Sequence, residues 1–419
     1  MEKSIIVGVF EIDKKDFEIS CILEELELLT SSAGGQVVKI FFQKKKTPDN
    51  KFLMGKGKAA EIKNYACARH IDLIVFYNHL SNVQQRNLEV FFDIKVIDRT
   101  RLILDIFATR ARSLEGKLQV ELAQLLYLLP RLTGKGILLS RLGGGIGTRG
   151  PGETKLEVDR RRIKKRISMI NKRLSRVLKN RDIQRKNRDA FPVPVVSLVG
   201  YTSAGKSTLF KTMTGEEVFI SKQLFSTLDP LLRRVGLNEI EKGYYFLLSD
   251  TVGFIREMPR ELLKSFRATL EELVHADLIM HVVDISQNDY LNQKKEVEKV
   301  LAEMKVPDDR ILTVFNKIDL MDAEMDHEML SGRDISSAFV SAKEARGIIN
   351  LKRLIFSKYF KDYQKYSITM PQNLMNLNSF KHWAIVTHHS EKRNMVHVEV
   401  LCSREKMIKF KEKFGGYVK

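Results

Sequence analysis

Apolar residues in the first hundred positions gather in short runs, and stretches with helical spacing separate these runs. The runs cover residues 5–10, 37–42, 71–77 and 94–97 and are rich in β-branched and aromatic side chains. Strands that alternate with helices form a parallel sheet that the helices cover. The pattern therefore predicts a small N-terminal α/β domain over residues 1–98.

Two longer stretches with apolar residues at helical spacing follow, and a glycine-dense segment separates them. The stretches run from about 100 to 129 and from about 154 to 188, and the glycine-rich loop covers 142–153. This spacing predicts two long amphipathic helices, and the loop cannot pack a core of its own. We expect a helical hairpin arm over residues 99–190, with a coiled-coil spacer and a disordered turn as the open alternative.

The second predicted helix carries a large excess of positive charge on its polar face. The chain has 71 Lys and Arg against 52 Asp and Glu, a formal net charge of +19, and Arg160, Lys164 and Lys165 belong to this helix. A positive surface favours association with polyphosphates through counterion release. Net charge alone is equally consistent with a basic surface that contacts only solvent. The concentration of positive charge on one helix favours a contact with nucleic acid.

An apolar run at 195–199 leads into an eight-residue segment that matches G-x-x-x-x-G-K-[ST]. In such a loop backbone N–H groups enclose phosphates, the lysine adds positive charge near the β and γ groups, and the hydroxyl binds Mg²⁺. The residues of the segment and the one that continues it as a helix are Gly200, Tyr201, Thr202, Ser203, Ala204, Gly205, Lys206, Ser207 and Thr208. This pattern predicts a nucleotide site without distinguishing ATP from GTP.

Three later segments, each after a strand-like run, distinguish the two nucleotides. Asp250 and Gly253 fit D-x-x-G, in which the carboxylate holds Mg²⁺ and the glycine N–H meets the γ-phosphate. The N-K-x-D segment consists of Asn316, Lys317, Ile318 and Asp319, and the S-A-K segment of Ser341, Ala342 and Lys343. The carboxylate of Asp319 can accept two hydrogen bonds from guanine, whereas adenine has no such donor pair. The order of these segments predicts a GTP site.

The first switch is expected at residues 225–230, where Phe225 borders the nucleotide and Thr227 binds Mg²⁺ and senses the γ-phosphate. Lys206, Thr227, Asp250 and Gly253 are thus the candidate catalytic residues, and Ser207, Thr227 and Asp250 the candidate metal ligands. Phe254 stands where many GTPases have a glutamine that orients water. We therefore expect slow intrinsic hydrolysis that a partner accelerates.

Hydropathy and cysteine spacing bear on the cellular compartment of the protein, and the remaining segments give the other domain boundaries. The sequence has no run of 18 uncharged apolar residues, and its three cysteines form no C-x-x-C pair. We expect a cytoplasmic monomer, with transient membrane association as an open possibility. The GTPase domain is expected over 193–358 and a small C-terminal α/β domain over 359–419, which makes the chain a multidomain α/β protein.

With these segments in view, the chain resembles the HflX family of ribosome-associated GTPases from about residue 55 to 356. The segments that carry the likeness beyond the general GTPase motifs are residues 99–107, 115–124, 143–157, 227–230 and 250–256. The resemblance implies action on the large (50S) ribosomal subunit and separation of stalled 70S ribosomes. It also implies that the arm tip approaches the peptidyl transferase centre and contacts rRNA. The tip residues in this sequence are Arg141, Gly143, Gly144, Gly145, Arg149 and Gly150.

Ser203 departs from the family, which has an asparagine at this position of the phosphate loop. That asparagine helps to coordinate an activating K⁺ in some GTPases, so the resemblance does not carry K⁺ activation over to this chain. Two alternatives stay open. One is an RNA-remodelling or assembly factor with an ATP site near residues 55–58, and the other is a regulatory module that holds GTP without turnover, for which Phe254 is the only hint.

Overall fold

A computed structural model describes residues 2–132, 155–189, 193–215, 231–251, 253–257, 259, 262, 265, 273–321, 337–371, 384–392 and 394–414. The chain divides into two compact units. The first comprises Met1–Ser175, Ser221–Asp229 and Glu257–Arg267, and the second Arg176–Ile220, Pro230–Arg256 and Ala268–Lys419. The multidomain α/β class predicted from the sequence is confirmed.

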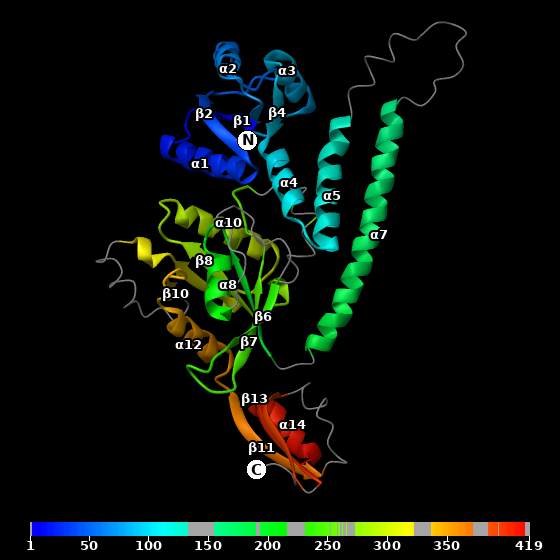
Figure 1. Cartoon of the computed structure of the whole chain (residues 1–419), viewed down its shortest axis with the longest axis vertical. Coiled ribbons are helices and arrows are strands. Elements are labelled where there is room, and N and C mark those ends of the chain that lie inside the picture. Colours follow the sequence, from blue (N-terminus) through cyan, green and yellow to red (C-terminus); the bar gives the residue numbers. More distant parts are fainter. Residues whose placement is uncertain are drawn as a thin grey trace, which may run out of the picture. The chain divides into compact units, whose positions relative to one another are not determined.

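The elements follow the order labelled in Figure 1. In the first unit they are β1 (Glu2–Phe10), α1 (Asp16–Ser32), β2 (Gly35–Lys44), α2 (Lys56–Arg69), β3 (Leu73–Phe76), α3 (Asn82–Phe92), β4 (Lys95–Asp98), α4 (Arg99–Arg110), α5 (Leu114–Leu128), η1 (Leu129–Leu132) and the start of α7 (Lys155–Asp189). The four strands form a parallel sheet in the order β2-β1-β3-β4. Helices α2 and α3 pack on one face with Ile5 and Val7, and Leu23 of α1 approaches Gly8 on the other face.

The run Gly55–Lys58, the only local hint of a second nucleotide site, forms the start of α2. Gly55 is the N-cap residue of this helix and its N–H donates to Gln43 Oε1 at 2.9 Å. Gly57 already lies inside the helix, and a Cβ built on it would meet nothing within 4 Å. The segment is therefore accounted for as a helix start.

The single long helix predicted for about 100–129 is wrong, because the structure breaks it into α4 and α5. Ala111 leaves the helical conformation, and the Ser113 side chain accepts a hydrogen bond from Gly116 N at 2.9 Å. A serine that caps orphan N–H groups starts a new helix at this point. The apolar spacing is less regular over residues 110–116, but spacing alone does not place the end of α4 or the start of α5.

Helix α7 confirms the second predicted helix to within a residue at each end and lies beside α5 in Figure 1. Leu118 and Leu122 of α5 pack against Ile170 and Leu174 of α7. Beside this seam, Arg166 makes a bidentate pair with Glu121, at 2.6 and 2.9 Å. The predicted arm tip falls in residues 133–154, outside the described residues.

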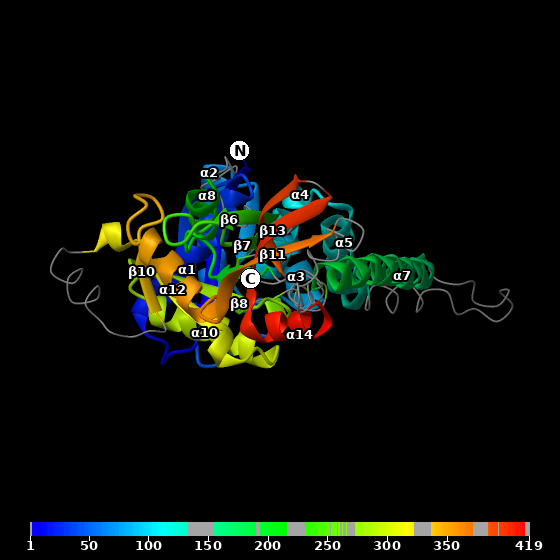
Figure 2. The same ribbon diagram turned by 90° about the horizontal axis from the view of Figure 1, so that it is seen from below.

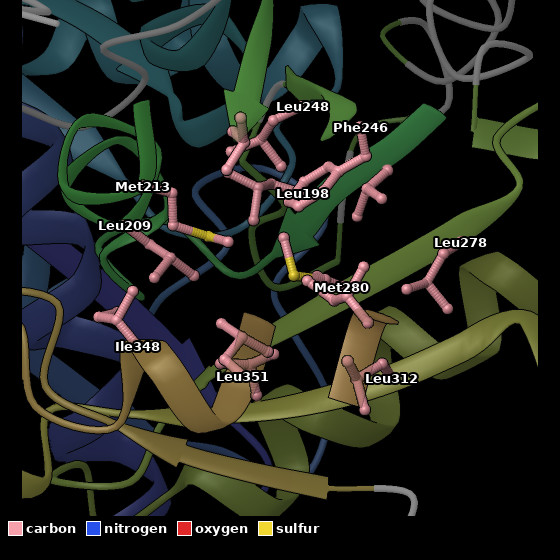
Figure 3. Close-up of a cluster of buried hydrophobic side chains, with 14 of the residues drawn as sticks. Leu198, Leu209, Met213, Phe246, Leu248, Leu278, Met280, Leu312, Ile348 and Leu351 are labelled. Atoms are coloured by element: carbon pink, nitrogen blue, oxygen red, sulfur yellow. The ribbon is translucent and has the colours of Figure 1, made fainter. Parts of the chain in front are cut away.

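The second unit contains a six-stranded sheet in the order β10-β9-β8-β5-β7-β6, in which only β6 runs antiparallel to its neighbour. Its elements are β5 (Val195–Gly200), α8 (Lys206–Thr214), β6 (Leu231–Gly236), β7 (Tyr245–Asp250), β8 (Leu278–Asp284), α10 (Tyr290–Glu303), η2 (Asp308–Arg310), β9 (Ile311–Asn316), η3 (Ile318–Leu320), β10 (Ser337–Val340) and α12 (Ile348–Tyr359). Figure 3 shows the core on one face, where side chains of α8 and α12 meet those of β5, β7, β8 and β9. Helix α10 packs against β5 and β8.

A three-stranded antiparallel sheet follows, in the order β11-β13-β12, and α14 packs against β13. These elements are β11 (Tyr363–Pro371), β12 (Ile385–Lys392), β13 (Met395–Ser403) and α14 (Arg404–Phe414), seen from below in Figure 2. Val396, Val398 and Val400 alternate inward toward Met407 and Phe410, which makes a small separate core. In the part of the chain that the structure describes, no helix is long and apolar enough to cross a membrane.

Candidate functional site

The phosphate loop connects the carboxyl end of β5 to the first turn of α8. Gly200 has φ +155°, and a Cβ on it would lie 2.2 Å from the carbonyl oxygen of Val282 in the neighbouring strand. Gly205 has φ +91°, and its Cβ would lie 2.2 Å from Asn316 Nδ2. Both positions exclude any larger residue, which explains the two glycines of the motif.

Lys206 is the first residue of α8 and its ammonium is buried inside the loop. Its Nζ donates to the carbonyl oxygens of Gly200 and Tyr201, at 3.0 and 2.7 Å. Burial lowers the pKa of Lys206 to about 8, although the charge of Asp250 opposes that change. The first turn of α8 therefore brings the N-terminal backbone of a helix close to a cation, which is the arrangement that binds phosphates.

A hydroxyl and a carboxylate converge beside this lysine. Ser207 Oγ donates to Asp250 Oδ2 at 3.1 Å, and Asp250, the last residue of β7, is fully buried. Gly253 also lies against the loop, since a Cβ on it would be 3.1 Å from Lys206 Nζ. The structure thus brings four of the predicted residues together, whereas Phe225 and Thr227 lie outside the described residues.

The segment after Gly253 is hydrogen-bonded to the phosphate loop by its backbone. Phe254 N donates to Gly200 O at 3.0 Å, and Thr202 N donates to Phe254 O at 2.6 Å. The Phe254 side chain is 2% exposed. Next along the chain, Arg256 N donates to the Tyr201 hydroxyl at 2.5 Å and the Arg256 side chain pairs with Asp289. Phe254 therefore packs in the interior beside the phosphate loop, and its side chain has no polar group that could orient water.

The predicted guanine loops meet at the buried side chain of Asn316. Its Nδ2 donates to Ala204 O at 2.8 Å, and its Oδ1 accepts from Ala342 N at 3.0 Å. The Ala342 N–H thus connects the S-A-K segment to the N-K-x-D segment. Thr212 of α8 adds a further connection, because its hydroxyl donates to Ala342 O at 2.7 Å.

The remaining predicted residues lie around this junction. Ser341 is buried and its hydroxyl accepts from Glu344 N at 3.1 Å, while Lys343 is exposed. Asp319 is half-buried in η3. Ser203 lies in the phosphate loop, and Thr208 lies in the first turn of α8. Sequence reasoning missed Asp284, whose carboxylate lies 2.6 Å from Lys317 Nζ. The apolar run at residues 278–283 predicts a buried strand, and an aspartate at the end of such a strand was the sequence signal for a site residue.

Three protein-family models match successive parts of this chain. The family described as "GTP-binding GTPase N-terminal" matches residues 21–108, "GTP-binding GTPase Middle Region" matches 110–188, and "50S ribosome-binding GTPase" matches 195–317. A GTP-binding protein of Sulfolobus solfataricus in complex with GDP aligns over 86% of this chain and 99% of its own, with 25% identity and a TM-score of 0.45.

Two relatives span most of both chains. The GTPase HflX of Caldanaerobacter subterraneus subsp. tengcongensis is 43% identical over 404 residues, 96% of this chain and 91% of the relative. The GTPase HflX of Escherichia coli is 41% identical over 382 residues, 90% of this chain and 88% of the relative. This chain therefore belongs to the HflX family of GTPases.

Proposed function

We propose that this GTPase binds GTP with Mg²⁺, associates with the large ribosomal subunit, and uses its GTP cycle to dissociate or rescue stalled 70S ribosomes. It would act in the cytoplasm as a monomer, and the basic arm would contact rRNA near the peptidyl transferase centre. Residues 195–317 match the family described as "50S ribosome-binding GTPase", which supports the large ribosomal subunit as the partner.

The oxygen ligands around Lys206 support the Mg²⁺ part of the proposal. Ser207 Oγ and Asp250 Oδ2 lie 3.1 Å apart at the phosphate loop, and hydroxyl and carboxylate oxygens are the ligands that Mg²⁺ prefers. A bound Mg²⁺ would neutralise charge on the phosphates. Lys206 would add a second positive charge there, and Asp319 would select guanine by accepting its two N–H donors.

The basic face of α7 is the main structural support for the proposed contact with the ribosome. The apolar side of α7 packs against α5, and Arg166 is paired with Glu121. Arg160, Lys164 and Lys165 remain exposed on the same helix. Exposed cations on the polar side of such a helix can bind the phosphates of an RNA backbone, and this binding is favourable because it releases counterions.

Phe254 supports a partner-dependent reaction. Since its side chain is buried and its backbone is held by Gly200 and Thr202, another group must order the attacking water. Completing such a site is worth about 10³ to 10⁵ in rate. We therefore propose slow turnover by the free protein and fast turnover on the ribosome.

The test is GTP turnover by the free protein, with isolated large subunits, with 70S ribosomes and with bare RNA, each at two salt concentrations. We expect strong stimulation by large subunits that weakens with salt and with the double change Lys164→Glu and Lys165→Glu. The matched control is Lys295→Glu with Lys299→Glu on α10, which makes the same change in charge on another helix. Deletion of 143–152 tests the arm tip.

Sedimentation of 70S ribosomes with protein and GTP then measures splitting. Stimulation without a rise in free subunits would leave a ribosome-dependent GTPase that does not split. Equal turnover in every mixture would reject the ribosomal proposal and leave only the GTPase.

A further inference from the structure

A buried carboxylate outside the recognised GTPase motifs lies against the guanine loop. Asp284, the last residue of β8, is 3% exposed and its Oδ2 is 2.6 Å from Lys317 Nζ. Its Oδ1 accepts from Ser286 Oγ at 2.6 Å and from Ser286 N at 3.1 Å. Three donors thus hold this carboxylate in one orientation.

The sheet places Asp284 beside the loop by strand register. Strands β8 and β9 are parallel, and Asp284 is the partner of Asn316 in their pairing. One residue further, Ile285 N donates to Asn316 O at 3.2 Å. The carboxyl end of β8 is therefore hydrogen-bonded directly to the first residue of N-K-x-D.

Lys317 itself needs such support. Its backbone has φ +67°, a left-handed conformation that is uncommon for residues other than glycine. Its side chain is long, retains 29% exposure, and without a partner would sample many rotamers in solvent. A fixed partner for the ammonium orders both the loop and the aliphatic stem of Lys317.

We propose that Asp284 is a positioning residue for guanine nucleotides, which acts through Lys317 and touches neither base nor phosphate. This inference rests on the proposed role of Asn316–Asp319 as the guanine loop. Ordering Lys317 before the nucleotide arrives removes that entropic cost from binding. Loss of the carboxylate charge returns the cost to the binding step, while the phosphate loop keeps its geometry.

The first experiment measures the affinity and release rate of a fluorescent GDP analogue for Asp284→Asn in the full-length chain. We expect Kd to rise about tenfold, mostly through faster release, and KM for GTP to rise with kcat unchanged. The control is Asp277→Asn, which alters the carboxylate just before the other end of β8, where it accepts from Val195 N at 2.8 Å. This control should retain the wild-type Kd.

A double-mutant cycle separates positioning from a general structural role. Asp284→Asn should raise Kd about tenfold in the wild-type background but less than about twofold in a Lys317→Ala background. Equal effects in both backgrounds, or a fall in kcat with KM unchanged, would overturn the inference. If Asp284→Asn does not fold, Ser286→Ala, which removes one of the three donors to the carboxylate but keeps its charge, provides the same cycle with a smaller expected effect.

A further variant distinguishes this inference from the proposal beneath it. An Asp319→Ala variant that binds GDP as tightly as wild type would reject the proposed guanine loop. A Lys317→Ala variant that binds weakly, together with an Asp284→Asn variant that binds normally, would reject only the role of Asp284.

Discussion

The side-chain amide of Asn316 donates to the carbonyl oxygen of Ala204 at 2.8 Å and so connects the guanine loop to the phosphate loop. Its oxygen accepts from Ala342 N, which connects the third loop to the same side chain. Because the residue is 2% exposed, these hydrogen bonds are shielded from water. One buried amide therefore holds the three nucleotide loops in a single arrangement.

Asn316→Ala should raise Kd for GDP by at least about tenfold, because it removes two buried hydrogen bonds of about 0.5–1.5 kcal/mol each. Equilibrium binding of a fluorescent GDP analogue measures this change. Asn350→Ala on α12 removes an exposed asparagine and serves as the control. Unchanged affinity in Asn316→Ala would mean that the loops hold their arrangement without this residue.

Gly205→Ala should abolish measurable nucleotide binding, since the new methyl group would lie 2.2 Å from Asn316 Nδ2 at a φ of +91°. Its counterpart Gly57→Ala lies in helix α2 with open space around the new Cβ, so it should raise the free energy of unfolding by about 0.5–1 kcal/mol. Denaturation and GDP binding on both variants test the pair. ATP hydrolysis that is lost in Gly57→Ala would instead revive an ATP site at the start of α2.

Asp98→Asn should lower the free energy of unfolding by about 3 kcal/mol, because it breaks a buried ion pair. Asp98 accepts from Tyr127 Oη and Arg131 Nη2, both at 2.8 Å, and from Arg101 N at the start of α4. The control Asp105→Asn removes a partly exposed pair with Arg101 and should cost less than about 1 kcal/mol. Urea unfolding compares the two, and equal losses would contradict the ranking.

The effect of Asp98 should also depend on pH. Burial tends to raise the pKa of Asp98, but hydrogen bonds from His79 and Arg101 N and the charge of Arg131 hold it below 3.8. Because the folded-state pKa is lowered, the stabilisation is complete above the unfolded-state pKa of about 4 and is lost as the pH falls through the folded-state value. The stability difference between wild type and Asp98→Asn should therefore shrink only below about pH 4.

His281 of β8 should make the protein less stable in mild acid. Burial, then the charges of Lys294 and Lys206, lower its pKa to about 3, whereas the unfolded value is near 6.5. Between these values only the unfolded chain gains the proton, so the free energy of unfolding should fall by up to about 1.4 kcal/mol per pH unit below pH 6.5. His281→Gln should flatten that slope. The same slope in wild type and variant would show that His281 is not its source.

Several parts of the site could be predicted because each consists of consecutive residues after a strand. The phosphate loop, N-K-x-D and S-A-K need only local conformation, and strands β5, β7, β9 and β10 were recognisable from their apolar runs. The helix break at 111–113 could not be placed by spacing alone. It depends on Ser113 capping Gly116, which competes with continued helix over a few residues.

Local chemistry was enough to predict a guanine nucleotide, the candidate residues that would contact it and the basic character of α7. The contacts between distant segments needed the fold: Asp284 pairs with Lys317, Asn316 reaches Ala204, and Arg166 pairs with Glu121. The physical reason is that these contacts depend on strand order, register and helix pairing. Such pairings form between residues far apart in the chain, and no pattern within a single segment specifies them.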